Sequence, residues 1–216
     1  MPEPRLDPPR PPRRGPVAGV LLAAGTSSRM GEVNKMLLEI DGETLLRRAA
    51  RRAVEAGLVP VVVVLGHQAE RAAAELAGLA CRPVVNPGYA AGIVTSVRAG
   101  LAALPRETAA AMVILADMPF VTPEMIAALV GRYRAGDAPL VLSDYDGVHA
   151  PPMLYDRSLF AELTAMEDGR CGKQVVKRHR HQAESLVWPA AALADLDTPQ
   201  DVERLVGGAA TPGAVS

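Results

Sequence analysis

The sequence alternates short, continuous apolar runs with stretches of helical periodicity. The runs at Val17–Leu22, Val61–Leu65 and Met112–Leu115 contain no charged or hydroxyl side chain. Strands buried on both faces have this pattern, because helices cover both sides of a parallel sheet. The alternation therefore predicts an α/β fold, with a mainly parallel sheet between two layers of helices.

Shorter signals complete this expected order. Further strands are predicted at Pro83–Val85 and Leu140–Leu142, with an edge strand over 151–155. Helices are expected at Thr44–Ala56, Gln68–Leu76, Ile93–Ala103, Pro123–Tyr133, Ser158–Met166 and Lys173–His179, with a last one after Thr198. Thr122 before Pro123 is a typical helix start, since threonine caps the free N–H groups and proline fits the first turn.

The two ends of the chain differ from its centre. Residues 1–16 are rich in proline and arginine, cannot bury apolar area, and are expected to be a disordered tail. Residues 17–206 are expected to form a single domain, and 207–216 a second disordered tail. No internal repeat divides the central part.

Composition excludes several classes of function. The formal net charge is −1, whereas broad nucleic-acid binding needs a basic face. Aromatic residues are 3% of the chain, too few for a base-stacking platform. No apolar run reaches the length of a membrane span, and no secretory signal is expected at the N-terminus. Two distant cysteines, Cys81 and Cys171, form no metal-binding spacing, so we expect a cytoplasmic protein with reduced thiols.

The segment after the first apolar run combines glycine, hydroxyl and basic residues. Gly25, Thr26–Ser28, Arg29, Gly31 and Lys35 follow one another at the expected carboxyl end of a strand. Ligands of open α/β sheets bind at such ends, glycines let backbone N–H groups approach a phosphate, and the two cations add positive charge. The segment therefore favours a polyphosphate site. The alternative is a glycine–serine turn with solvated charges.

Two common phosphate-binding motifs are absent. In a P-loop, four residues separate the glycines and lysine follows the second, but here five residues separate Gly25 from Gly31, and Glu32 follows. The G-x-G-x-x-G dinucleotide fingerprint is also missing, which argues against a nicotinamide-dependent oxidoreductase.

The stretch "LLAAGTSSRMGEVNKMLLEIDGETLL" resembles the L-A-A-G-x-x-x-R-M-G-x-x-x-K-x-L-L signature of the MobA-like nucleotidyltransferases. Matches to "NPGYAAGIVTSVRAGL", "ILADMPFVTPEMI" and "LADLDTPQDVERL" follow in the family's order, so the resemblance covers about residues 17–206. The closest subgroup is the molybdenum cofactor cytidylyltransferases. The resemblance implies a Rossmann-like three-layer αβα sandwich of the nucleotide-diphospho-sugar transferase type.

The resemblance also implies roles for individual residues. Arg29 and Lys35 fall where the family grips the triphosphate, and Asp117 falls on its magnesium-binding aspartate. The implied nucleotide-binding positions are Leu22, Ala23, Ala24, Gly25, Gly88, Gly92 and Ser96. From the residues alone, Asp117 also fits a turn aspartate, and Gly88–Gly92 a glycine-rich loop before a helix.

A second metal ligand is less clearly indicated. Many cytidylyltransferases of this group carry G-D-x-G-A-R in the later part of the chain, but the corresponding stretch here is "EDGRCGKQVV", with Arg170 in place of the aspartate. Asp195 and Asp197 are the favoured replacements, ahead of Asp168, because "DLDTP" matches the family in order. Their alternative role is an exposed pair at a helix entry.

The family reaction transfers a nucleoside monophosphate from an NTP to an acceptor phosphate and releases pyrophosphate, with Mg²⁺ as the metal. Ala24 favours CTP, because the family variant with leucine-alanine-alanine-glycine usually accompanies pyrimidine nucleotides. The implied acceptor is a phosphorylated pterin such as molybdopterin cofactor, and the implied recipient is a molybdoenzyme or its chaperone. The alternatives are a guanylyl- or uridylyltransferase acting on another phosphorylated acceptor, and a non-catalytic maturation factor that binds the cofactor.

Overall fold

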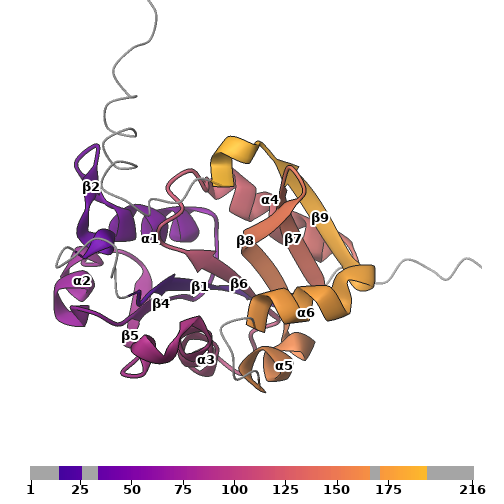
Figure 1. The fold of residues 1–216 in the computed structure, drawn as a ribbon, viewed down its shortest axis with the longest axis horizontal. Coiled ribbons are helices and arrows are strands. Elements are labelled where there is room, and N and C mark those ends of the chain that lie inside the picture. Colours follow the sequence, from indigo (N-terminus) through magenta and orange to yellow (C-terminus); the bar gives the residue numbers. More distant parts are fainter. Residues whose placement is uncertain (1–14, 26–33, 166–170, 194–216) are drawn as a thin grey trace, which may run out of the picture.

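The computed structural model describes residues 15–25, 34–165 and 171–193. Within them, seven strands form one sheet in the order β5-β4-β1-β6-β8-β7-β9 (Figure 1). The strands are β1 (Val17–Ala23), β4 (Val61–Leu65), β5 (Cys81–Val85), β6 (Ala110–Leu115), β7 (Leu140–Tyr145), β8 (Val148–Asp156) and β9 (Ala183–Trp188). A separate two-stranded hairpin consists of β2 (Glu39–Ile40) and β3 (Glu43–Thr44).

Helices cover both faces of the sheet. They are α1 (Leu45–Glu55), α2 (Ala69–Glu75), α3 (Ile93–Ala102), α4 (Pro123–Ala135), α5 (Phe160–Ala165) and α6 (Cys171–His179). Short 3₁₀ turns are η2 (Lys35–Leu37), η3 (Tyr89–Ala91), η4 (Arg157–Leu159), η5 (Arg180–Gln182) and η6 (Ala190–Leu193). Buried side chains of α1, α2 and α4 belong to one apolar cluster, and those of α3, α5 and α6 to another. The predicted three-layer αβα sandwich is confirmed.

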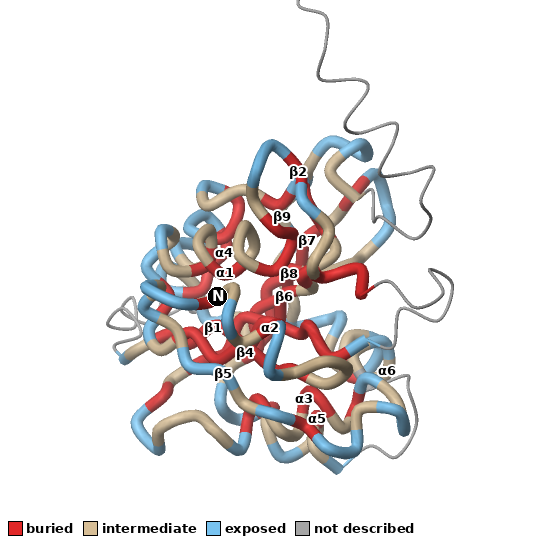
Figure 2. Tube along the Cα trace, turned by 90° about the vertical axis from the view of Figure 1, so that its left-hand side faces the viewer, coloured by how far each residue is buried: buried red, intermediate tan, exposed pale blue. Residues whose placement is uncertain are grey.

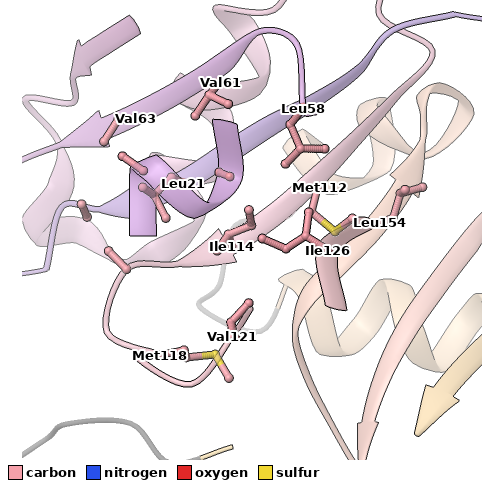
Figure 3. Close-up of a cluster of buried hydrophobic side chains, with 14 of the residues drawn as sticks. Leu21, Leu58, Val61, Val63, Met112, Ile114, Met118, Val121, Ile126 and Leu154 are labelled. Atoms are coloured by element: carbon pink, nitrogen blue, oxygen red, sulfur yellow. The ribbon is translucent and has the colours of Figure 1, made fainter. Parts of the chain in front are cut away.

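The two apolar clusters follow from the alternation of side chains along each strand. In β1, Leu21 faces the α1–α4 side, whereas Val20 and Leu22 face the α3 side. Figure 3 shows the first cluster, which joins Leu21 of β1 with residues of β4, β6, β8 and α4. Figure 2 shows that buried residues run along the strands through the middle of the molecule. The central strands are therefore apolar without interruption because both of their faces are covered.

Strand β8 corrects one prediction, because it is interior and not an edge strand. It pairs antiparallel with β6 through Met153–Asp156 and with β7 over most of its length. Proline lacks the N–H that an interior strand donates, which makes a proline-containing run look like an edge. Pro151 and Pro152 lie beyond the residues paired with β6, and the β7 register shifts between Val141 and Ser143. Ser143 Oγ also donates to Pro152 O at 2.7 Å.

The actual edge on this side is β9, which has no counterpart among the predicted strands. It pairs parallel with β7, and its exposure alternates along the strand. Val187, for example, is 73% exposed. A half-exposed edge strand carries fewer apolar residues than a central one, so the apolar-run criterion misses it.

The predicted helix boundaries agree with the observed ones to within a few residues. Thr44 Oγ1 accepts a hydrogen bond from Arg47 N at 3.3 Å and caps α1. Thr122 Oγ1 accepts from Met125 N at 3.3 Å and caps α4, as predicted. The predicted helix after Thr198 lies outside the described residues. Among the described helices, none is long and apolar enough to cross a membrane.

Candidate active site

The carboxyl ends of four parallel strands meet at one edge of the sheet. Strands β5, β4, β1 and β6 are adjacent and run in the same direction. The segments that leave this edge are therefore neighbours, although they lie far apart in the sequence. They begin at Ala24 after β1, Gly66 after β4, Asn86 after β5 and Ala116 after β6. This is the edge at which open α/β sheets bind ligands.

Lys35 and Asp117 form an ion pair at this edge. Lys35 lies in η2, and its Nζ donates to Asp117 Oδ2 at 3.0 Å, across 82 positions of sequence. The Lys35 side chain is 8% exposed and that of Asp117 is 27% exposed. The two residues that the sequence assigns to phosphate and metal binding are thus brought together, with the carboxylate open to solvent on one side.

The end of β1 offers backbone groups to this edge. Leu22, Ala23 and Ala24 are buried, whereas Gly25 is exposed and an added Cβ there would contact nothing within 4 Å. The Ala24 side chain belongs to the apolar cluster beneath α3. Its methyl group is therefore packed in the core, and any effect on a bound base would act through the position of the backbone.

Gly66 lies tightly between the end of β1 and the segment after β5. A Cβ on Gly66 would approach Ala24 O and Tyr89 Cγ to 2.6 Å each. The segments that follow β1, β4 and β5 are therefore in close contact at this point, and the position requires a residue without a side chain.

Asn86 organises the segment that contains Gly88, Gly92 and Ser96. Its side chain is buried, and its Nδ2 donates to Thr95 Oγ1 at 2.8 Å and to Ser96 Oγ at 3.0 Å. Its Oδ1 accepts from Gly88 N at 3.0 Å. Gly92 has φ of +113°, which glycine adopts readily, and it precedes the first residue of α3. Ser96 is itself buried, and its hydroxyl stabilises this segment by accepting the hydrogen bond from Asn86.

A second pair of polar side chains lies in the β7–β8 hairpin, near the carboxyl end of β7. His149 in β8 pairs in register with Asp144 in β7, and Nε2 of the histidine lies 3.6 Å from Oδ2 of the aspartate. Both side chains are partly exposed. His149 is therefore held in the sheet.

Several predicted site residues lie outside the described part of the chain. They are Arg29, Asp195 and Asp197, together with Asp168, the other candidate for a second metal ligand. Within the described residues, no group of three or more histidine, cysteine, aspartate or glutamate side chains could hold a metal ion. Asp117 is thus not part of a metal-binding cluster of three or more such side chains among the residues that the structure describes.

Three residues of this region were not predicted from the sequence. Asn34 caps the turn that carries Lys35. Arg52 in α1 donates to Pro119 O and, at 2.9 Å, to Val121 O. Asn86 holds the segment after β5. Asn34 and Asn86 do carry a weak signal, because asparagine favours the first position of a turn and Asn86 precedes a proline.

Comparisons with known proteins give one family match and several similar sequences. Residues 19–183 match the family model described as MobA-like NTP transferase domain. Nicotine blue oxidoreductase from Paenarthrobacter nicotinovorans is 30% identical over 199 residues, which cover 88% of this chain and 96% of that protein. Other similarities are shorter. A probable molybdenum cofactor guanylyltransferase from Natronomonas pharaonis is 39% identical over 48% of this chain and 50% of its own length. The bifunctional protein GlmU from Anaeromyxobacter dehalogenans is 48% identical, but over only 13% of its length.

Solved structures share the fold over nearly the whole chain. Rv0371c from Mycobacterium tuberculosis H37Rv superposes with a TM-score of 0.79 at 27% identity, covering 89% of this chain and 98% of that one. A structure of the same protein in complex with manganese has a TM-score of 0.73 at 25% identity, with the same coverage.

Proposed function

Because the chain belongs to the MobA-like NTP transferase family and is a nucleotidyltransferase, we propose that it transfers CMP from CTP to a phosphorylated pterin such as molybdopterin cofactor. Pyrophosphate is the second product, and Mg²⁺ is the metal. The reaction class rests on the family, whereas the nucleotide, the metal, the acceptor and the individual site residues are what we propose.

The Lys35–Asp117 ion pair is the observation that carries this proposal. Transfer from an NTP needs a cation for the phosphates and a carboxylate for the metal, both at the ligand-binding edge of the sheet. The 3.0 Å contact brings one of each together from segments 82 positions apart. An ordinary surface pair would not support this role, but here the lysine is buried beneath the edge and the carboxylate is partly open.

The chemistry of Asp117 fits a divalent metal. A carboxylate is a hard, anionic oxygen ligand, and Mg²⁺ in nucleotide sites usually takes one or two such ligands, with phosphate oxygens and water completing its shell. Asp117 is one such ligand, and Asp195 and Asp197 are proposed for the second. When bound, the metal supplies positive charge to the triphosphate. The manganese complex of Rv0371c supports a divalent metal in a protein of this fold.

The proposed residues bind and orient the two reactants. An oxygen of the acceptor phosphate attacks the α-phosphorus of the nucleotide, a new P–O bond forms, and the bond to the bridging oxygen of pyrophosphate breaks. Lys35 and Arg29 neutralise charge on the α-phosphoryl group and on the leaving pyrophosphate. Such preorganised charge contributes much of the rate in this kind of transfer.

Backbone groups complete the proposed nucleotide site. The base and ribose contact the segment Leu22–Gly25, of which Gly25 is exposed. Gly88, Gly92 and Ser96 form the segment that closes over the nucleotide, and the N–H groups at the start of α3 favour an anion. His149, at the carboxyl end of β7, is a candidate contact for the acceptor.

The choice of CTP rests on Ala24, which matches the family variant that usually accompanies pyrimidine nucleotides. Because the Ala24 methyl group is packed beneath α3, this selection would work through the backbone, which could sit differently if glycine stood there. The similarity to a probable molybdenum cofactor guanylyltransferase supports a pterin acceptor and makes GTP the main alternative nucleotide. A molybdoenzyme or its chaperone would then receive the product.

The full-length similarity to nicotine blue oxidoreductase favours one alternative activity. The missing dinucleotide fingerprint argues against this activity, whereas the similarity over nearly the whole relative argues for it. The test is to mix the chain with nicotine blue and a reduced nicotinamide cofactor and to follow both absorbances. Loss of both signals at a catalytic rate would favour the redox activity.

A pyrophosphate-release assay tests the main proposal. Each of the four NTPs is combined with molybdopterin-type acceptors and with sugar phosphates, in the presence of Mg²⁺. We expect release with CTP and a pterin acceptor, and a loss of at least about a hundredfold in Lys35→Met. If GTP is the one NTP that gives pyrophosphate release with an acceptor, the proposed nucleotide is GTP and not CTP. If release occurs with a sugar phosphate and not with a pterin, the proposed acceptor is wrong. Unchanged turnover in Lys35→Met would contradict the proposed role of this residue.

A further inference from the structure

Asn34 makes three hydrogen bonds that join two parts of the candidate site, the turn η2 and the turn after β4. Its carbonyl oxygen accepts from Leu37 N at 2.9 Å, and its Oδ1 accepts from Met36 N at 3.0 Å. Its Nδ2 donates to His67 O at 3.1 Å, in the turn that follows β4. The residue is only 5% exposed. These contacts surround Lys35, which is the next residue in the sequence.

The side chains of Asn34 and Lys35 bond to segments that follow the two strands on either side of β1. In the sheet, β1 lies between β4 and β6. Asn34 bonds to the segment after β4, while the lysine reaches Asp117, after β6. The turn η2 is therefore attached on both sides of the strand end that the nucleotide would contact. A lysine side chain has about 2 kcal/mol of rotamer entropy, so its ammonium group stays in one place only when a fixed main chain and the ion pair with Asp117 act together.

We propose that Asn34 is the positioning residue of Lys35: its bond to His67 O fixes the turn from which Lys35 reaches the triphosphate. This inference rests on the proposed function of Lys35. Displacement of a reacting group by 1 Å can cost about a hundredfold in rate, so a tether of this kind affects turnover. Since Lys35 acts on charge that develops in the transition state, its displacement lowers kcat more than it raises KM.

Asparagine is the side chain that fits both tasks. It carries an acceptor for Met36 N and a donor for His67 O in one rigid amide. Serine keeps a hydroxyl that can cap the turn but is too short to reach His67 O as well. Aspartate keeps the shape and the cap but directs a second acceptor toward the carbonyl of His67. Asn34→Ser and Asn34→Asp therefore separate capping from the tether.

The reactivity of the Lys35 amine measures its position without any nucleotide. The chain contains three lysines, Lys35, Lys173 and Lys177, and the latter two are exposed on α6. Brief treatment with an amine-acylating reagent, followed by mass spectrometry, gives the modification of Lys35 relative to the two reference lysines in the same sample. We expect this ratio to rise several-fold in Asn34→Ser and Asn34→Asp, because the ion pair with Asp117 opens more often.

Kinetics and a matched control complete the test. Asn34→Ser is expected to lower kcat about tenfold, with the KM for the nucleotide changed less than about twofold. Thr44→Ala removes the cap of α1, a cap of the same kind outside the site, and should cost about 1 kcal/mol of stability without changing kcat or the acylation ratio.

The outcomes distinguish this inference from the proposed function. If Asn34→Ser has the acylation ratio and kcat of the wild type, or if Thr44→Ala raises the ratio equally, Asn34 is only a cap and the inference is wrong. If the wild type neither binds nor turns over any NTP, the proposed function fails, while the acylation ratio still reports whether Asn34 positions Lys35.

Discussion

Arg52 is a single side chain that holds the loop carrying Asp117. It is half-buried, and its guanidinium donates to the carbonyls of Pro119 and Val121. Burial lowers the pKa of the guanidinium, which nevertheless remains charged at any ordinary pH. The contact links α1 to the segment after β6, on the side of Asp117 opposite to the strand.

Replacement of Arg52 by methionine should loosen this loop. The two carbonyls lose a charged donor, which predicts a loss of about 1–3 kcal/mol in the free energy of unfolding and a lower kcat. The neighbouring Arg51→Met is the matched control, because Arg51 pairs with Glu43 and Glu55 nearer the surface. It should cost at most about 1 kcal/mol and leave kcat unchanged. Urea unfolding and initial rates of both variants test this, and equal effects would show that Arg52 has no particular role in the loop.

Asp117→Asn removes a charge while keeping the volume of the side chain. Because a carboxamide attracts a divalent cation far less than a carboxylate, we expect metal-dependent turnover to fall at least about a hundredfold. Spin-resonance titration of Mn²⁺ in the presence of nucleotide should show weaker binding. Asp146→Asn, an exposed position in the β7–β8 turn with φ of +54°, is the control and should behave as the wild type. Unaltered Mn²⁺ binding by Asp117→Asn would remove this residue from the metal site.

At the scale of single residues, the sequence predicted Lys35 and Asp117 as site residues, but not the residues that hold them in place. Lys35 and Asp117 stand in motifs, and their charges indicate what they can bind. Asn34 and Arg52 bind backbone carbonyls of distant segments, at His67, Pro119 and Val121. Every residue type has such a carbonyl, so the sequence gives no sign of which ones will lie within reach.

Among the elements, α3 packs closely on the sheet through Gly100. A Cβ there would overlap Val20 Cγ1 of β1 and lie 3.1 Å from Val64 Cγ2 of β4. Both neighbours are β-branched and buried, so neither can turn aside easily. The helix therefore depends on glycine at this position, although glycine is a poor helix former.

Gly100→Ala should destabilise the protein by about 1–3 kcal/mol, because overpacking outweighs the gain in helix propensity. Gly131→Ala in α4 is the opposite case, since an added Cβ would meet nothing within 4 Å. The same substitution should stabilise by up to about 1 kcal/mol there. Thermal and urea unfolding of the two variants give the signs, and a stabilising Gly100→Ala would contradict the close packing of α3 on β1.

The contact between α5 and α6 should depend on pH. His179 Nε2 lies 2.7 Å from Glu162 Oε2, and Arg178 Nη1 donates to Oε1 at 2.8 Å. Burial acts to raise the pKa of the Glu162 carboxyl, but the hydrogen bonds from His179 and Arg178 outweigh it, so the pKa lies below its ordinary value of 4.5. A lowered folded-state pKa means that this stabilisation is present above pH 4.5 and is lost as pH falls through the folded-state value.

Glu162→Gln isolates this effect. The difference in unfolding free energy between the wild type and Glu162→Gln should be largest near neutral pH and should shrink as pH falls below 4.5. Because the side chain is partly exposed, we expect a difference of at most about 1 kcal/mol. Urea titrations at several pH values measure it, and a difference that does not vary with pH would show that the ionised carboxylate contributes nothing.

At the scale of elements, prediction succeeded where one physical cause dominates. Central strands and capped helices such as α4 are determined by burial on both faces and by local hydrogen bonds. Strand β8 was misplaced because two prolines outweighed its other residues, and β9 was missed because an edge strand needs few apolar side chains. The order of the strands in the sheet depends on pairing between segments that are distant in the sequence. A single sequence contains little direct information about such pairing.

For the whole molecule, nucleotide binding should appear as thermal stabilisation. A ligand that binds only the folded state adds about 2.7 kcal/mol of stability when its concentration is a hundred times Kd. We expect CTP with Mg²⁺ to raise the melting temperature more than GTP, UTP or ATP does, and more than CTP does without metal. A larger shift with GTP would reassign the nucleotide, and no shift with any NTP would contradict nucleotide binding.

The antiparallel strand β8 divides the sheet into two parallel blocks, β5-β4-β1-β6 and β7-β9. The ladder between them consists of Ala110–Val113 of β6 paired with Met153–Asp156 of β8, supported by contacts of α4 with β7 and β8 and of α3 with α5. Lys35 and Asp117 belong to the first block, whereas Asp144 and His149 belong to the hairpin beyond the ladder. A hybrid protein that takes residues 136–193 from a relative therefore has to preserve this seam, together with the hydrogen bonds that cross it, such as Arg98 to Thr164 O and Tyr133 to Asp156. If the proposed function holds, exchanging the second block would change the surroundings of Asp144 and His149, and so the acceptor, while leaving the proposed phosphate-binding residues of the first block unchanged.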